Sequence, residues 1–249
     1  MLSRKSILLI ALLFFASYLL FAAVTLPAQL TWSQVQKQLP AEDVALTQIE
    51  GTLWRGSGQF HYQQHSVPLS WRVRLAELLR LRAGVEVSLS DPGLQSKATV
   101  SLSPAGTLRV TLDGQVHPAR ILELAQFREL EIPGPVRLEQ LEVHLQGSHF
   151  SHATGNTTWS GGTVRSILPG NHFEIDFPAL EGRLELEDDG PIFSIARSGD
   201  DQPILQASLN ENGWARLVLM NHLTRAIDLP WPIQGGRDGT IISYEEKVF

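Results

Sequence analysis

The chain begins with an unbroken run of uncharged, mostly apolar residues from Ser6 to Leu26. At about 1.5 Å of rise per helical residue, this run extends roughly 30 Å, the thickness of the hydrocarbon core of a bilayer. Arg4 and Lys5 precede the run and the next cation is Lys37, so the positive-inside rule keeps the N-terminus in the cytoplasm. The pattern predicts a membrane helix with the rest of the chain on the far side.

A cleaved secretory signal would share the basic start but has a shorter apolar core and a small-x-small cleavage site. The sequence around Ala22 and Ala23 offers no clean site of that kind, and the run is long for a signal. We therefore favour an uncleaved anchor. Both alternatives export the remaining chain.

From Val44 onward, apolar and polar residues alternate with a period of two, which is typical of half-buried antiparallel strands. Examples are the segments 85–89, 99–102, 108–112, 136–138, 141–145, 184–186 and 217–219. Turn-forming residues separate them at 91–93, 103–106, 113–114, 190–191 and 212–213. Helical spacing is confined to short stretches at 31–39, 74–82 and 119–127.

These patterns predict a mainly β protein: a single N-terminal transmembrane helix followed by an elongated, curved antiparallel β-sheet domain with one or two short helices. We divide the chain into a cytoplasmic tip (1–5), a transmembrane helix (6–26), a juxtamembrane segment (27–43) and a periplasmic β-rich domain (44–249). Segment 101–112 aligns without gaps on 208–219. Two similar meanders are one interpretation of this alignment, and chance similarity between alternating strands is the other.

The amino-acid composition restricts the functions that the chain can have. The chain has no cysteine, which excludes disulfides and thiolate sites and fits a bacterial envelope protein. Without Arg4 and Lys5, 18 cations face 26 anions, a net charge of −8 beyond the membrane. Phosphate binding needs a basic face, so we predict no nucleic-acid partner.

The spacing of the histidines does not indicate a metal site. His61 and His65, if they share one strand, lie about 13 Å apart, which is too far to share an ion. His149 and His152 fall in a polar stretch that resembles a loop, with no third ligand nearby. The chain also lacks a nucleophile elbow, a phosphate-binding glycine loop and a zinc-protease helix. We predict no metal, no cofactor and no enzymatic activity.

The tryptophans are more informative than the titratable groups. The string from Gly51 to Gly56 places Trp54 beside glycines, which lets a second ring or backbone pack closely. We interpret these rings as structural pillars of the sheet rather than ligand-binding groups. The structural positions that we single out are Gly51, Thr52, Leu53, Trp54, Gly56, Trp71, Trp159 and Gly161.

Five features of the sequence carry a family resemblance: the anchor, its exit at 26–28, the string from Ile49 to Gly58, Trp71, and the second tryptophan-glycine block at 155–162. Together they resemble the protein N family of the type II (general) secretion pathway. The resemblance covers nearly the whole chain. It implies an inner-membrane protein of Gram-negative bacteria with a periplasmic β-rich domain. It also implies an accessory or assembly role in exporting folded proteins across the outer membrane, together with other secretion-system subunits and without catalytic residues.

A different class of function also fits the pattern. A tethered sheet with one apolar face suits an envelope protein that handles lipids or lipoproteins in an open apolar β-groove. The observation that separates the two hypotheses is whether side chains close the apolar face, as in a packed core, or leave it open along its length.

Overall fold

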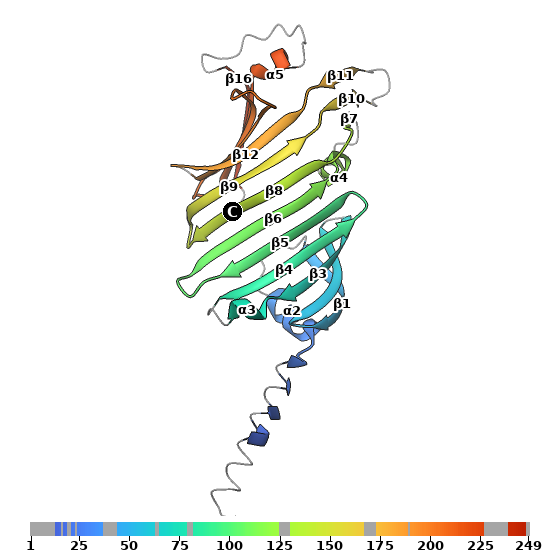
Figure 1. The fold of residues 1–249 in the computed structure, drawn as a ribbon, viewed down its shortest axis with the longest axis vertical. Coiled ribbons are helices and arrows are strands. Elements are labelled where there is room, and N and C mark those ends of the chain that lie inside the picture. The colour runs from blue at the N-terminus through green and yellow to red at the C-terminus, as the bar shows by residue number, and fades with distance from the viewer. Residues whose placement is uncertain are drawn as a thin grey trace, which may run out of the picture. The chain divides into compact units, whose positions relative to one another are not determined.

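The computed structural model describes residues 13–15, 17–18, 21–22, 24–36, 44–62, 65–78, 82–124, 130–166, 173–188, 190–226 and 239–247. Antiparallel strands dominate this part of the chain, with a few short helices (Figure 1), which confirms the prediction of a mainly β, antiparallel protein with short helices. The chain divides into two compact units, Met1–Val73 and Arg74–Phe249, which are described one at a time.

Among the described residues, no helix combines the length and the apolar character needed to cross a membrane. The expected tip at 1–5 and much of the expected anchor at 6–26 lie outside the described residues. The large apolar side chains that are described in the anchor are all exposed: Leu13, Phe14, Phe15, Tyr18, Phe21, Val24 and Leu26. The transmembrane helix therefore stays a prediction.

The first unit is a short helix followed by a three-stranded meander. Its elements are α2 (Ala28–Gln36), β1 (Val44–Thr52), β2 (Arg55–Tyr62) and β3 (His65–Val73). The strands pair consecutively and antiparallel, so that Leu46, Phe60 and Val67 form one cross-strand row. Val67 is buried. Apolar residues thus gather on one face of this meander, as the period-two pattern predicted.

The second unit is built on one long antiparallel sheet. Its elements are α3 (Leu75–Leu78), β4 (Ala83–Asp91), β5 (Leu94–Leu102), β6 (Thr107–Val116), α4 (Pro118–Leu124), β7 (Leu130–Glu131), β8 (Val136–Gln146), β9 (His149–Trp159), β10 (Gly162–Ser166), β11 (Glu174–Phe177), β12 (Leu180–Glu187), β13 (Gly190–Arg197), β14 (Pro203–Leu209), β15 (Trp214–Met220), α5 (His222–Ala226) and β16 (Thr240–Lys247).

Within this unit the strands follow the order β4-β5-β6-β8-β9-β12-β13-β14-β15-β16, and a small sheet has the order β11-β10-β7. Figure 1 shows β4 to β9 nearly face-on and the strands next to β16 nearly edge-on, so the sheet turns strongly along its length. A right-handed twist between neighbouring strands accumulates into such a turn when many strands follow one another.

Most predicted strands and turns lie where the alternation placed them. The turn between β4 and β5 is an Asx turn, in which the Gly93 N–H donates to Asp91 Oδ1 at 2.7 Å. The helical stretches at 74–82 and 119–127 contain α3 and α4, although both helices are short. The predicted helix at 31–39 overlaps α2, which begins three residues earlier at Ala28.

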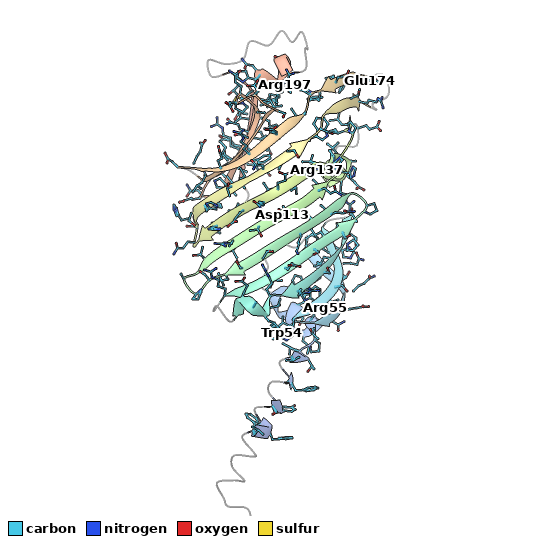
Figure 2. The ribbon with its side chains drawn as sticks, in the orientation of Figure 1. Trp54, Arg55, Asp113, Arg137, Glu174 and Arg197 are labelled. Carbon is cyan, nitrogen blue, oxygen red and sulfur yellow. The ribbon has the colours of Figure 1, made fainter. Side chains whose placement is uncertain are left out.

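One predicted turn is wrong. Asp113 and Gly114 do not form a turn; they lie inside β6, where the register with β8 shifts between Leu112 and Gly114. Asp113 Oδ1 accepts a hydrogen bond from the Gln140 N–H at 2.8 Å (Asp113 is labelled in Figure 2). The same residue types that make a tight turn therefore make a β-bulge here.

The histidine placements also differ from expectation. His61 lies on β2 and His65 on β3, because a hairpin separates them, so they do not share one strand. His149 and His152 lie on β9 rather than in a loop. The His152 ring contacts the ring of His144 on β8, with ring centroids 4.8 Å apart.

The aligned segments 101–112 and 208–219 form equivalent hairpins, β5–β6 and β14–β15. In the first, Ser103 N donates to Thr107 O and Gly106 N donates to Ser103 O, both at 3.0 Å. In the second, Asn210 N donates to Trp214 O at 2.9 Å and Gly213 N to Asn210 O at 3.0 Å. Gly106 and Gly213 share a φ of 78°. The two backbone–backbone hydrogen bonds of the first turn are repeated in the second, and duplication of a whole meander remains a prediction.

Helix α4 is fixed to the β4–β5 turn by a partly buried cation. Arg120 Nη2 lies 3.1 Å from Asp91 Oδ2, and Arg120 Nη1 donates to Glu123 Oε2 at 2.6 Å. The Glu123 hydrogen bond, helped by the Asp91 charge, raises the pKa of Arg120 although burial opposes the charge. The His117 N–H donates to Gly93 O at 2.8 Å, which completes the attachment.

Candidate functional site

The string from Gly51 to Gly56 forms the turn between β1 and β2, and Trp71 of β3 packs over it. Gly56 lies opposite Gly51 on one side and opposite Trp71 on the other. A Cβ on Gly56 would lie 2.3 Å from Trp71 Cζ2, so only glycine leaves room for the ring. Gly51 has a φ of 95°, in the region that favours glycine.

The indole of Trp71 also fastens this turn by hydrogen bonds. Its Nε1–H points at two carbonyl oxygens, those of Thr52 at 3.3 Å and Leu53 at 3.2 Å. The Val73 N–H donates to the carbonyl oxygen of Trp54 at 2.7 Å. Figure 2 labels Trp54 and Arg55 at this turn. We call the assembly formed by 51–56 and Trp71 the tryptophan clamp.

The tryptophan clamp holds the segment that follows the predicted anchor. The Leu53 N–H donates to Leu26 O at 2.9 Å, and Pro27 forms an antiparallel bridge with Thr52. One turn further, the Gln29 side-chain amide donates to Ile49 O at 2.9 Å. Ala28, at the start of α2, is buried. The exit from the expected membrane segment is thus bound to the most family-specific part of the sequence.

The second tryptophan block, in the second unit, has its own partners. The Trp159 Nε1–H donates to Pro133 O at 2.7 Å, and the Trp159 ring lies 6.1 Å from the Phe177 ring between centroids. Gly161 has a φ of 77°, and a Cβ there would lie 2.5 Å from Phe177 O. Sequence reasoning did not find Pro133 or Phe177, because both come from irregular or short segments without a periodic signal.

The apolar face of the second unit is a further candidate site. Its side chains stand opposite one another in cross-strand rows over β4, β5, β6 and β8. The rows are Val85–Val100–Val110–Val143, Val87–Ala98–Leu112–Leu141 and Ala83–Leu102–Leu108–Leu145. We call these twelve positions the aliphatic rows.

None of the twelve positions in the aliphatic rows is buried, and most of them are half-buried. Leu102 is 48% exposed. Farther along the sheet, Leu217 and Tyr244 stand opposite each other and are exposed as well. On β9, by contrast, Phe150 and Ala153 stand opposite Leu145 and Val143 and are both buried, so this face is covered in one part and half-exposed in another.

The opposite face of the same strands is polar. Lys97 Nζ lies 3.1 Å from Glu86 Oε2, and Arg109 Nε lies 3.4 Å from Glu142 Oε1. Surface pairs of this kind contribute little stability but mark a solvated surface. These strands therefore have one polar face and one apolar face.

Groups that resemble a metal site are not found among the described residues, where no cluster of three or more His, Asp or Glu side chains is suitably placed. A cavity of about 520 Å³ lies on the polar side of β13 to β16, with Trp214, Arg216 and Glu245 among its walls. Arg216 and Glu245 are ion-paired at 3.2 Å. This cavity is a solvated recess between paired charges.

Comparison with known proteins identifies the family of this chain. The profile of the family described as Type II secretion system (T2SS), protein N matches residues 42–220. A protein of Aeromonas hydrophila named Type II secretion system protein N is 30% identical over 194 residues, which cover 74% of this chain and 75% of that protein. No solved structure matches. The resemblance inferred from the tryptophan-glycine strings is thereby confirmed, and the chain belongs to the type II secretion system protein N family.

Proposed function

We propose that the chain is a non-enzymatic accessory subunit of the type II secretion system, anchored in the inner membrane by residues 6–26. In this proposal the N-terminus is cytoplasmic and the sheet lies in the periplasm. The sheet takes part in the export of folded proteins across the outer membrane by contacting other secretion-system subunits. The observation that carries the proposal is the attachment of the anchor's exit, Leu26 and Pro27, to the tryptophan clamp.

The geometry of that attachment suits a membrane-bound assembly role. Three contacts spread over four residues, from Leu26 to Gln29, hold the exit against the β1–β2 hairpin. A glycine-rich or polar linker would let the first unit rotate freely, whereas this junction restricts its orientation to the membrane segment. We propose that the family positions in this unit have this structural role; they are Gly51, Thr52, Leu53, Trp54, Gly56 and Trp71.

The charged groups support a role without catalysis. The carboxylates on the polar face are held in exposed ion pairs, as in Lys97 with Glu86 and Arg216 with Glu245. A catalytic acid or base works together with further functional groups that converge on a substrate, whereas the charges of these pairs are engaged by one another. The polar face is therefore assigned to solvent.

For the contact with partner subunits we propose the edge formed by β16. This strand pairs with β15 on one side and borders no other described strand. Its side chains Ile242 and Tyr244 are 59% and 58% exposed. A strand that ends the described sheet and exposes apolar side chains is suited to β-strand addition by another chain.

The topology is tested directly because the chain lacks cysteine. A single cysteine is introduced as Ser3→Cys or as Ser90→Cys, the latter at an exposed position of β4. After the outer membrane is made permeable, a membrane-impermeant maleimide is expected to label the Ser90→Cys chain and not the Ser3→Cys chain. Labelling of Ser3→Cys in sealed inner membranes would contradict the proposed orientation.

The role in secretion is tested in cells that lack the chain. The full chain is expected to restore release of a folded substrate, and a version with residues 1–26 replaced by a cleaved signal is not. Equal release by the two versions would remove the requirement for the tether. A photo-crosslinking residue in place of Tyr244 is expected to capture secretion subunits more strongly than one in place of Thr99 on the polar face; the reverse would move the contact away from β16.

A further inference from the structure

We propose that Arg55 and Arg72 bind the phosphate group of an anionic phospholipid at the surface of the membrane that holds the chain. This inference rests on the proposed function only in placing residues 6–26 in that membrane. Its starting observation is that Arg55 of β2 and Arg72 of β3 stand directly opposite each other and are both exposed. Like charges in this arrangement weaken a sheet, and an anion bound by both side chains would offset their repulsion.

The described part of the first unit supplies no carboxylate for the two arginines. Neither of them takes part in an ion pair among the described residues, whereas Arg109 of the second unit is engaged by Glu142. Glu50 stands on the same face, one row away and opposite Ser57, and it forms no ion pair with either arginine. Within the described residues, both guanidinium groups are therefore available to an external anion.

A row of backbone partners connects the two arginines to the membrane exit. Pro27 forms an antiparallel bridge with Thr52. Thr52 in turn stands opposite Arg55, which stands opposite Arg72. Neighbouring strands are about 4.8 Å apart, so the backbone of Arg55 lies roughly 10 Å from Pro27. The headgroup layer is about 5–8 Å thick on each side of the hydrocarbon core, and long basic side chains extend to reach it. Lipid phosphates are thus within reach of Arg55.

The geometry of the pair suits one phosphate group. Directly opposed side chains start about 5 Å apart, so two guanidinium groups can converge on a single anion. Each guanidinium presents a planar fork of donors that matches two oxygens of a phosphate. Phosphatidylglycerol keeps the negative charge of its phosphate, whereas the choline of phosphatidylcholine balances it. The pair therefore favours an anionic headgroup.

An acidic segment of another protein would also be attracted to two arginines. The position of the pair favours lipid, because the contacts of Leu26 and Pro27 with the β1–β2 turn hold it beside the membrane exit. A tether of this kind gives the neighbouring headgroups a high effective concentration at the site.

The test measures lipid binding to the full-length chain in micelles of a neutral detergent, by native mass spectrometry at increasing lipid concentration. The unaltered chain is expected to retain phosphatidylglycerol at concentrations at which it does not retain phosphatidylcholine. Arg55→Gln combined with Arg72→Gln is expected to weaken phosphatidylglycerol binding by about tenfold or more, because the charge-assisted hydrogen bonds of both guanidinium groups are lost.

The matched control is Arg137→Gln combined with Arg197→Gln. It removes the same charge from two exposed arginines of the second unit, which Figure 2 labels together with Arg55. These two stand opposite Thr158 and Leu180 rather than opposite another cation. The control is expected to bind phosphatidylglycerol like the unaltered chain.

A further variant separates the guanidinium fork from its charge. Arg55→Lys combined with Arg72→Lys keeps both charges but removes the fork, and it is expected to bind phosphatidylglycerol with an affinity between those of the unaltered chain and the glutamine variant. All the substituted side chains are exposed, so each variant is expected to fold, and circular dichroism establishes that it keeps the sheet.

Four outcomes would overturn the inference. Equal loss of binding in the glutamine variant and its matched control would show attraction by overall charge. Equal retention of the two lipids by the unaltered chain would show that the pair does not select an anionic headgroup. Displacement of phosphatidylglycerol by inorganic phosphate at the same concentration would assign the pair to the free ion. Unchanged binding in the glutamine variant would show that the two arginines do not hold the lipid.

These measurements can fail independently of the proposed function. Binding in micelles depends neither on the orientation of the chain nor on other secretion subunits, which maleimide labelling and substrate release report directly. Absence of selective lipid binding together with the expected topology and secretion would overturn this inference alone. Selective lipid binding together with the opposite topology or without a role in secretion would overturn the proposed function alone.

Discussion

Gly56 of β2 stands directly opposite Trp71 of β3, and the benzene ring of the indole fills the space beside the Gly56 Cα. A Cβ at position 56 would lie 2.3 Å from Trp71 Cζ2 and 2.4 Å from the carbonyl oxygen of Glu50. The ring is held in place by its hydrogen bonds to the β1–β2 turn, and the Glu50 oxygen belongs to the backbone. Neither neighbour is free to move aside without disturbing the tryptophan clamp.

Gly56→Ala is therefore expected to lower the free energy of unfolding by about 3 kcal/mol, the upper part of the usual range for overpacking. The measurement is urea unfolding of the detergent-solubilised full chain, followed by circular dichroism. Ser57→Ala, at the exposed neighbouring position, is the control and is expected to change little. An unchanged unfolding midpoint for Gly56→Ala would show that the ring does not occupy this space.

Trp71→Phe removes the hydrogen bonds of the indole together with the part of the ring nearest Gly56. The phenyl ring lacks the N–H that reaches the carbonyl oxygens of Thr52 and Leu53, and it is too short to replace the Cζ2 and Cη2 atoms beside Gly56. The expected loss is about 2 kcal/mol, because the hydrogen bond contributes about 1 kcal/mol and the lost ring contacts add to it. Trp214→Phe, at a 45% exposed position, is the control and is expected to have a smaller effect. Equal losses in the two variants would argue against a specific role for the Trp71 indole.

Asp113→Ala removes the acceptor for the Gln140 N–H and leaves the β6 and β8 bulges without their connection. Hydrogen exchange of the Gln140 amide is expected to accelerate, by about fivefold if the bond contributes about 1 kcal/mol. Asp113→Asn keeps a side-chain oxygen and is expected to restore most of the protection. Exchange at Gln140 that is the same in Asp113→Ala and in the unaltered chain would show that the bond does not protect this amide.

Asp113 also shows where sequence reasoning fails. An Asp-Gly pair between two alternating segments is a strong turn signal, and Asp91 does begin a turn of this kind. At 113–114 the same residue types form a bulge, because β8 continues past them and supplies the Gln140 N–H. The outcome depends on a strand 27 residues away, which a local pattern does not contain.

The strands themselves were predictable because one face is apolar. Val85, Val100, Val110 and Val143 are each flanked by polar residues, and this alternation locates the four strands and the face they share. The alternation does not reveal what lies above that face, because a buried row and an open row have the same pattern. Only the structure shows that the aliphatic rows are half-buried on β4 to β8, whereas Phe150 and Ala153, which continue them on β9, are buried.

The candidate site was predictable only in part for a related reason. Gly51 to Gly56 and Trp71 form a recognisable string, and glycines beside a tryptophan indicate close packing. That the clamp binds Leu26 was not predictable, because the bond joins two main-chain groups without a side-chain signal.

Asp91→Ala is expected to weaken the second unit by about 2 kcal/mol, because a charge-assisted hydrogen bond is lost together with the Asx turn. Asp91 lies 3.1 Å from Arg120 and accepts from the Gly93 N–H, and both charged side chains are largely shielded from solvent. Glu86→Ala, which removes the more exposed pair with Lys97, is the control and is expected to cost less than about 1 kcal/mol. Urea unfolding of the full chain distinguishes the two. Equal effects would show that α4 does not depend on the Asp91–Arg120 pair.

Because the two hairpin turns are equivalent, we expect the residues of one turn to be able to replace those of the other. When residues 210–213 are replaced by the residues found at 103–106, the backbone bonds between 210, 213 and 214 are expected to re-form, because the first turn makes the same bonds around a glycine with the same φ of 78°. The replacement loses the Glu211 contact with His149, an exposed pair worth less than about 1 kcal/mol.

Gly213→Ala keeps every side chain of the turn but places a Cβ in the left-handed region, which costs roughly 1–2 kcal/mol. The four-residue exchange is therefore expected to perturb unfolding less than this single substitution does. The opposite ranking would show that the two turns are similar in sequence by chance rather than interchangeable parts of a repeated meander.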